Sequence, residues 1–239
     1  YGYGSRVVHL LVDGADGMLR VEGLWSLGTN ASDVIVSNGT LFITNTTAYV
    51  FAGTNGGMRM GLVTGGGAWW TNGVGGLTIG SNAQVMVTAT GKLAYAGTLM
   101  VSSVTASAYG LVVTNGGQVL GAASAYVGYG ISHNAALVTG PGSAWNGGGQ
   151  SLYIGSGLAT NNVLRIENGG MVTNAALVIG NSVNATGNRL IVTNGGVLAG
   201  NTSVTLGNSS AGNSVLVVGG AGVTSLWNNA GNALTMGGT

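Results

Sequence analysis

LVVTNGGQV, at residues 111–119, is a phrase that this chain repeats. It returns as LIVTNGGVL at 190–198, as LRIENGGMV at 164–172 and, more altered, as VIVSNGTLF at 34–42. A second phrase, apolar-x-apolar-Gly, ends at Gly128, Gly155, Gly180 and Gly207. Both phrases recur about every 26 residues, and a repeat of this length made of short strands and turns is typical of a solenoid whose coils stack on one another. The predicted fold class is therefore an all-β, single-stranded β-solenoid, a β-helix.

The runs between the turns have the composition of short, half-buried strands. They are rich in Val, Ile, Leu and Thr, and where they alternate they do so with a period of two. We expect Leu, Val and Ile to face the interior, and mostly Thr, Ser and Asn to face outward. Asn-Gly pairs supply the positive φ angles of tight turns, so they should mark equivalent corners of successive coils. The predicted structural turns are Asn115-Gly116, Asn168-Gly169 and Asn194-Gly195.

A longer period lies over the short one. LVTGGGAW at 62–69 returns as LVTGPGSAW at 137–145 and, more loosely, as LVVGGAGVTSLW at 216–227. These copies are about 78 residues apart, so three coils form one super-repeat, and the chain holds about nine coils. At the strand spacing, nine coils make a rod about 43 Å long.

Trp69, Trp145 and Trp227 end the three long phrases, and two interpretations stay open for them. They fill a recurrent gap in the interior, or they form an exposed aromatic face with nearby tyrosines that binds sugars or a partner. These tyrosines are Tyr126, Tyr129 and Tyr153.

The composition excludes several classes of protein. Only 5% of the residues are charged and the net charge is +1, which leaves no electrostatic footprint for nucleic acid. Hydrophobic residues make up 45% of the chain, which argues against disorder. No uninterrupted apolar stretch reaches the length of about 18 residues that a membrane-spanning helix needs. There is no cysteine, so disulfides contribute nothing to stability. So few charges leave little repulsion between molecules, which favours self-association.

The charges gather near the N-terminus, and none follows Arg189. We interpret the run at residues 6–12 as a strand outside the repeat, and divide the chain into an N-terminal strand, cap or inter-subunit segment (1–19) and the solenoid (20–239). The C-terminal coils keep the strand pattern without charged protection, and an open coil edge is a template for pairing. Because two different ends make a heterologous contact, we expect head-to-tail assembly of this chain with itself. The predicted inter-subunit residues are Val7, Val8, Leu10, Val12, Val215, Val217, Leu226, Leu234 and Met236.

The phrases at 111–119, 164–172 and 190–198, with LYIG at 152–155 and LVIG at 177–180, resemble the autotransporter-associated β-strand repeats and related repeats of type V secreted and PEP-CTERM-associated bacterial proteins. The resemblance implies an extracellular, right-handed β-helix that serves as a stalk, an adhesin or a surface layer. The motif encodes corners and rungs, and it specifies no site. Two usual companions of such repeats, a C-terminal translocator barrel and a sorting tail, are not in this sequence.

The candidate chemical groups are few. The five acidic residues are Asp13, Asp16, Glu22, Asp33 and Glu167. Asp13 and Asp16 are interpreted as part of a polar turn, since further oxygen ligands for calcium are not evident. Arg165 and Glu167 share one face of a strand, with Arg189 about a coil later, which predicts a ladder of opposite charges. His9 and His133 have no partner at metal-ligand spacing. We expect no catalytic residue, no cofactor and no metal.

The sequence thus predicts an extracellular or cell-surface bacterial protein, and its start, Tyr1-Gly2-Tyr3-Gly4, suggests an exported and processed chain. The expected function is non-enzymatic and structural: a solenoid subunit that assembles end to end into a filament, fibre or sheath. The main alternative is an adhesin or autotransporter-type passenger that binds surface glycans or a host protein. A polysaccharide-active enzyme is the third.

Overall fold

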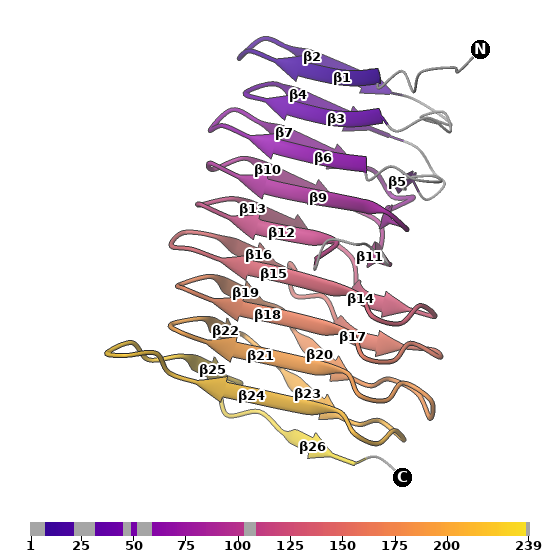
Figure 1. Ribbon diagram of the computed structural model, residues 1–239, viewed down its shortest axis with the longest axis vertical. Coiled ribbons are helices and arrows are strands. Elements are labelled where there is room, and N and C mark those ends of the chain that lie inside the picture. The colour runs from indigo at the N-terminus through magenta and orange to yellow at the C-terminus, as the bar shows by residue number, and fades with distance from the viewer. Residues whose placement is uncertain (1–7, 22–31, 45–48, 52–58, 103–108, 238–239) are drawn as a thin grey trace, which may run out of the picture.

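The computed structural model describes residues 8–21, 32–44, 49–51, 59–102 and 109–237. These residues form an all-β solenoid of three parallel sheets, in which each coil takes about 26 residues (Figure 1). This confirms the predicted fold class. No helix long and apolar enough to cross a membrane occurs in these ranges.

The second to ninth coils each contribute one strand to each sheet in turn, and the described part of the first coil contributes β1 to sheet A and β2 to sheet B. Sheet A contains β1 (Val8–Asp13), β3 (Ser32–Ser37), β6 (Arg59–Thr64), β9 (Ala83–Thr88), β12 (Leu111–Thr114), β15 (Ala135–Thr139), β18 (Val163–Glu167), β21 (Arg189–Thr193) and β24 (Ser214–Val218). Sheet B contains β2 (Met18–Val21), β4 (Thr40–Ile43), β7 (Trp69–Asn72), β10 (Lys92–Tyr95), β13 (Gln118–Gly121), β16 (Ala144–Asn146), β19 (Met171–Thr173), β22 (Val197–Ala199) and β25 (Leu226–Asn228). Sheet C contains β5 (Tyr49–Phe51), β8 (Leu77–Ile79), β11 (Leu99–Val101), β14 (Ala125–Tyr129), β17 (Leu152–Ser156), β20 (Ala176–Ile179), β23 (Ser203–Leu206) and β26 (Leu234–Met236).

The described residues form about eight full turns, close to the nine coils that the sequence predicts. Within the described ranges, sheets A and B have nine strands and sheet C has eight. β1 pairs in parallel with β3 over six residues, with Leu10 beside Val34 and Val12 beside Val36. The interpretation of this segment as a strand outside the repeat is therefore wrong, because β1 is the first strand of sheet A. The division of the chain at residue 19 stays a prediction.

Parallel pairing in register arranges the side chains in columns along the solenoid axis. One inward column of sheet A contains Val36, Val63, Val87, Val113, Val138, Ile166 and Val192, all with no exposed surface. Each such side chain contributes about 1.5–3 kcal/mol when it leaves water. The core is thus a continuous apolar cylinder that the three sheets enclose.

The outer surface is less polar than the sequence predicted. The middle residue of each apolar triplet in sheet A, such as Val112 in Leu111-Val112-Val113, must face outward because side chains alternate. These residues form an outer column of Leu11, Ile35, Leu62, Met86, Val112, Leu137, Arg165, Ile191 and Leu216. Val112 and Ile191 are only 8% exposed. Ser37, Thr64, Thr88, Thr114, Thr139 and Thr193 form the expected hydroxyl column two residues further along the strands.

The three-coil super-repeat corresponds to one inward column of sheet B. This column contains Leu19, Leu41, Trp70, Leu93, Val119, Trp145, Val172, Leu198 and Trp227, so every third rung is tryptophan. The equivalent of Trp145 in the third coil is Trp70, with no exposed surface, and not Trp69. Two adjacent residues of a strand face opposite sides, so Trp69 points outward.

Small residues make room for the tryptophans. At the facing position of sheet A, the third coil has Gly61 and the sixth has Ala136, whereas the other coils have Val or Leu. A Cβ added at Gly61 would lie 2.8 Å from the Trp70 ring and 3.2 Å from Val85. The interior therefore keeps a nearly constant volume by pairing a large side chain on one sheet with a small one on another.

Tyr95 and Trp145 form a polar contact in the core. Trp145 Nε1 donates a hydrogen bond to the Tyr95 hydroxyl over 3.2 Å, although the two residues are two coils apart. Gly121 lies between them, and a Cβ there would meet the Tyr95 hydroxyl at 2.3 Å. Burial raises the pKa of Tyr95 to about 12, against the smaller lowering effect of the Trp145 hydrogen bond.

A buried asparagine ladder closes the corner between sheets C and A. Asn162 Oδ1 accepts hydrogen bonds from Asn134 N–H at 2.9 Å and Nδ2 at 2.8 Å. Asn188 Oδ1 accepts the same pair from Asn162, at 3.0 and 2.8 Å, and Asn213 Oδ1 the same pair from Asn188, at 2.9 and 3.1 Å. Asn162, Asn188 and Asn213 thus each accept from the backbone and side-chain donors of the preceding asparagine, so a polar chain joins four coils, and Asn134 Oδ1 at its start has no hydrogen-bond partner among the described residues.

Gly61→Val should clash with Trp70 and lower the free energy of unfolding by about 3 kcal/mol, the upper end for overpacking. Adding Trp70→Leu, the residue of the second and fourth coils at that rung, should restore at least half of the loss. Chemical denaturation followed by circular dichroism measures both variants and Trp70→Leu alone. Additive losses in the double variant would contradict the paired-volume interpretation.

Asn162→Ala should lower the free energy of unfolding by about 3 kcal/mol, because it leaves the Asn134 donors and Asn188 Oδ1 without their ladder partner. Asn208→Ala is the matched control, since Asn208 is exposed and its side-chain contact to Asn181 is a long 3.4 Å. It should change the same free energy by less than about 0.5 kcal/mol. Equal effects in urea titrations of the two variants would refute the importance of the ladder.

Candidate functional site

The Asn-Gly pairs lie at the corner between sheets A and B. Asn115 and Gly116 have φ angles of 48° and 78°, and the pairs at 168–169 and 194–195 have closely similar values. In each turn the residue after Gly donates its N–H to the residue before Asn, over 2.9 Å. Asn194 Nδ2 also donates to Asn168 Oδ1, and Asn168 Nδ2 to Thr139 Oγ1 at 3.1 Å. These residues therefore position sheets A and B relative to one another.

The second glycine of the NGG phrase has a separate cause. Gly117, Gly170 and Gly196 have no positive φ angle, yet an added Cβ would lie 2.1, 2.4 and 2.3 Å from a carbonyl oxygen one coil earlier. Close backbone approach between coils therefore requires this glycine, whereas the turn requires the first.

The same corner of the fourth coil lacks the Asn-Gly pair. Ala89 and Thr90 have φ angles of 47° and 64°, and Gly91 N–H donates to Thr88 O at 2.9 Å. A left-handed conformation costs an ordinary residue roughly 1–2 kcal/mol. This corner therefore stores strain that its neighbours avoid.

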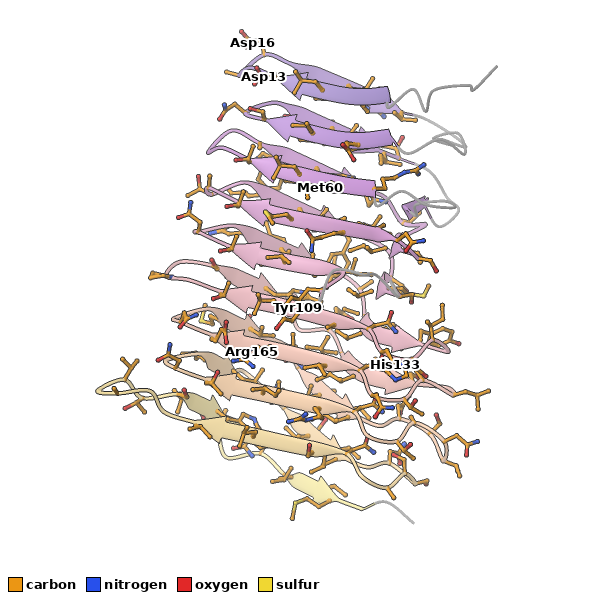
Figure 2. All side chains as sticks on the ribbon, in the orientation of Figure 1. Asp13, Asp16, Met60, Tyr109, His133 and Arg165 are labelled. Carbon is orange, nitrogen blue, oxygen red and sulfur yellow. The ribbon has the colours of Figure 1, made fainter. Side chains whose placement is uncertain are left out.

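The described acidic residues do not form a catalytic or metal-binding cluster. Asp13 and Asp16 lie at the first corner of the solenoid (Figure 2). Asp33 accepts a hydrogen bond from the Met60 N–H at 2.9 Å. Glu167 lies six strand spacings from Asp13 in sheet A, or about 29 Å. No three His, Cys, Asp or Glu side chains within the described ranges could hold one metal ion. Glu22 lies outside those ranges.

Arg165 and Glu167 form an ion pair on the outer face of β18 through Nε and Oε2. Arg189 does not continue it, because Arg189 lies beside Val163 and not beside Arg165 or Glu167. The predicted charge ladder is therefore a single partly exposed pair, which contributes at most about 1 kcal/mol. His133 is exposed at the corner before β15, far from Asp13 and Asp16 in Figure 2.

Trp69, Trp145 and Trp227 do not share an exposed face. Trp145 is 1% exposed, and Trp227 packs against the core with its Nε1 donating to Asn201 Oδ1 at 3.1 Å. Trp69 alone faces outward, on sheet B, where Lys92 Nζ lies 4.8 Å from its ring centre. The recurring phrase reflects an interior column that contains Trp70, Trp145 and Trp227, so the predicted aromatic face is wrong for Trp145 and Trp227.

The tyrosines do gather, on the outer side of sheet C. The Tyr126 and Tyr153 rings stack with centres 4.6 Å apart and planes inclined by 9°. Tyr129 meets Tyr126 edge to face, at 5.2 Å and 75°. Burial raises the pKa of Tyr126, and its two tyrosine neighbours raise it further. We call these three residues the tyrosine cluster.

The last coil presents an open apolar end. Its inward residues continue columns that are buried in earlier coils: Val217 follows Val192 and Leu234 follows Val204. Val192 and Val204 are at most 1% exposed, whereas Val217 is 40% and Leu234 45% exposed. Met236, at 69%, and the partly buried Val215 and Trp227 complete this surface, which we call the terminal face. It has an open hollow of about 160 Å³ lined by Trp227, Asn229 and Leu234.

The remaining predicted inter-subunit residues are in three places. Leu226 lies in the last coil but in an outer column of sheet B, beside Val197. Leu10 and Val12 lie in inward columns of the first coil, Leu10 against the core and Val12 6% exposed. Val8 is in β1, and Val7 lies outside the described residues.

No protein-family model, curated protein or solved structure matches this chain. The resemblance to autotransporter-associated repeats, and the right-handed winding that it implies, therefore stay predictions. The architecture itself is a β-solenoid.

Replacing Ala89-Thr90 by Asn-Gly should raise the free energy of unfolding by about 1–2 kcal/mol, since both residues then tolerate positive φ. Thermal and urea unfolding of the double variant check this gain. The reverse change, Asn115→Ala with Gly116→Thr, is the control and should lower the free energy by a similar amount. If the two changes have the same sign, the strain assigned to the fourth corner is wrong.

Proposed function

We propose that this chain is a non-enzymatic, extracellular structural protein whose solenoids join end to end into a filament, fibre or sheath. The observation that carries the proposal is the terminal face, because inward columns whose side chains are buried in earlier coils become exposed there. Covering them with another coil would remove Val217, Leu234 and Met236 from water. A fully buried side chain of this size contributes about 1.5–3 kcal/mol.

The first coil of a second copy has the residues to continue the columns. Stacking β1 on β24 in the register of the other coils would bring Leu10 onto Val215 and Val12 onto Val217. In sheet B the same step brings Leu19 onto Trp227. Apolar residues therefore meet apolar residues, and the free strand edges gain backbone hydrogen bonds by strand addition.

The charges do not oppose this contact. Asp13 would lie beside Val218 and Arg20 beside Asn228, both in outer columns. No charged side chain follows Arg189, so the side chains of the last coil carry no charge that would repel the first coil. The contact is head to tail, and such contacts propagate into filaments unless a rotation closes them.

The proposed location is the outside of a bacterial cell. It rests on the resemblance of the Asn-Gly phrases to secreted repeat proteins. Membership in that group of repeat proteins is part of this proposal.

An adhesin that binds surface glycans is the second candidate, and the tyrosine cluster is the observation that favours it. Sugars stack on the faces of aromatic rings, but Tyr126 and Tyr153 each cover one face of the other. An enzyme ranks third, because Asp13 and Asp16, the two acidic residues that share a turn, are both exposed to solvent, and Glu167 lies about 29 Å from Asp13.

Val217→Lys should raise the concentration at which filaments form at least tenfold, because stacking would bury an unpaired ammonium group. The isolated chain should tolerate it, since Val217 is 40% exposed there. Leu216→Lys is the matched control: it introduces the same charge one residue earlier, in an outer column, and should leave filament formation unchanged.

Negative-stain electron microscopy over a concentration series, with sedimentation of the same samples, provides the readout. Isolated short rods of the unmodified chain at every concentration would refute end-to-end assembly. A glycan array would then test the adhesin, with Tyr129→Ala as the variant expected to lose binding.

A further inference from the structure

The tyrosine cluster places two phenol rings at one strand spacing on an outer face. Tyr126 of β14 and Tyr153 of β17 are register partners in parallel strands, so their side chains leave sheet C side by side. Both are half-buried, and their stacked ring centres are 4.6 Å apart. Met100 of β11 precedes them in the column and Val178 of β20 follows them.

This contact does not serve the core. Tyr95, by contrast, is buried and hydrogen-bonded to Trp145, as an interior tyrosine should be. Tyr126 and Tyr153 have their rings outside the apolar cylinder, and Tyr129 beside them is 53% exposed. A half-buried, parallel pair of phenols on an outer face is prealigned for a reaction between the two rings, because the rings are already in contact.

We propose that Tyr126 and Tyr153 are a site of dityrosine formation, in which a hydrogen peroxide-driven haem peroxidase, as one-electron oxidant, joins adjacent coils by a carbon–carbon bond.

The coupling reaction conserves electrons and atoms. The oxidant takes one electron from each ring, and each hydroxyl proton goes to solvent, which leaves two tyrosyl radicals. The radicals combine through one Cε of each ring, and the hydrogen on each of these carbons then moves to its own ring oxygen. The protein thus loses two hydrogen atoms in total, and the two electrons and two protons reduce one hydrogen peroxide to two water molecules.

Register makes the reaction specific to this pair. The bond would connect positions that already face one another in β14 and β17, so the backbone keeps its hydrogen bonds. Tyr129 meets Tyr126 edge to face, with the ring planes inclined by 75°, so these two rings lack the parallel arrangement of Tyr126 and Tyr153. The product is a covalent bond between two neighbouring coils of one chain. Its formation does not depend on whether solenoids also join end to end.

The test treats the 239-residue chain with a haem peroxidase and limiting hydrogen peroxide at low protein concentration. Dityrosine fluorescence should appear while the chain stays at monomer size in denaturing electrophoresis. Tandem mass spectrometry should find the peptides of Tyr126 and Tyr153 joined, with the loss of two hydrogen atoms. Sulfoxide at Met100 is distinguished because it adds an oxygen atom.

Tyr126→Phe and Tyr153→Phe should each reduce intramolecular dityrosine at least tenfold. Tyr109→Phe is the matched control, because it removes one tyrosine and leaves the pair. Circular dichroism checks that all three variants keep the fold. The oxidised chain should also unfold at a higher temperature than the untreated chain, and this shift should be absent in Tyr126→Phe.

Three results would overturn the proposal. They are the absence of dityrosine in the folded chain, links found only between molecules, and a main product that joins Tyr126 to Tyr129.

Discussion

Parallel pairing in register between successive coils is the constraint on which the rest of this solenoid depends. Each residue in a strand has the residue one coil earlier and one coil later as its neighbours, about 4.8 Å away. The size and polarity that a position tolerates therefore depend on its neighbours in adjacent coils as much as on its neighbours in the same strand. This is why Val and Ile fill one inward column of sheet A from Val36 to Val192, and why the asparagines at the corner between sheets C and A form hydrogen bonds from coil to coil.

The interior shows how such columns admit exceptions. In the third and sixth coils the tryptophan of sheet B faces Gly61 and Ala136, whereas the partly buried Trp227 of the ninth coil faces Val215. Tyr95 occupies the space that Gly121 leaves one coil later. Volume is thus balanced across sheets and across coils, so the three-coil super-repeat is a packing period rather than a surface pattern.

Stacking also explains the polar and reactive features outside the apolar core. The Asn134–Asn213 ladder satisfies amides that a corner would otherwise bury without partners, and it does so by passing each hydrogen bond to the next coil. On the outer face of sheet C the same spacing brings Tyr126 against Tyr153. At the terminal face the stacking stops, and its apolar columns are left open. The proposed assembly and the proposed cross-link therefore both follow from one geometric rule.

Local sequence determined the coil length, the strand pattern and the Asn-Gly corners, because these depend on residues within a single coil: alternation, β-branching and positive φ. The sequence also shows that charged residues are few and that none follows Arg189. Only the tertiary structure decided that Trp70, and not Trp69, faces the interior, that β1 joins sheet A, and that Arg189 misses the Arg165–Glu167 pair. Each of these depends on register between coils, and the coils differ in length by a few residues. A shift of one residue turns a side chain from the core to the solvent, so register is settled by how whole columns pack and not by any single phrase.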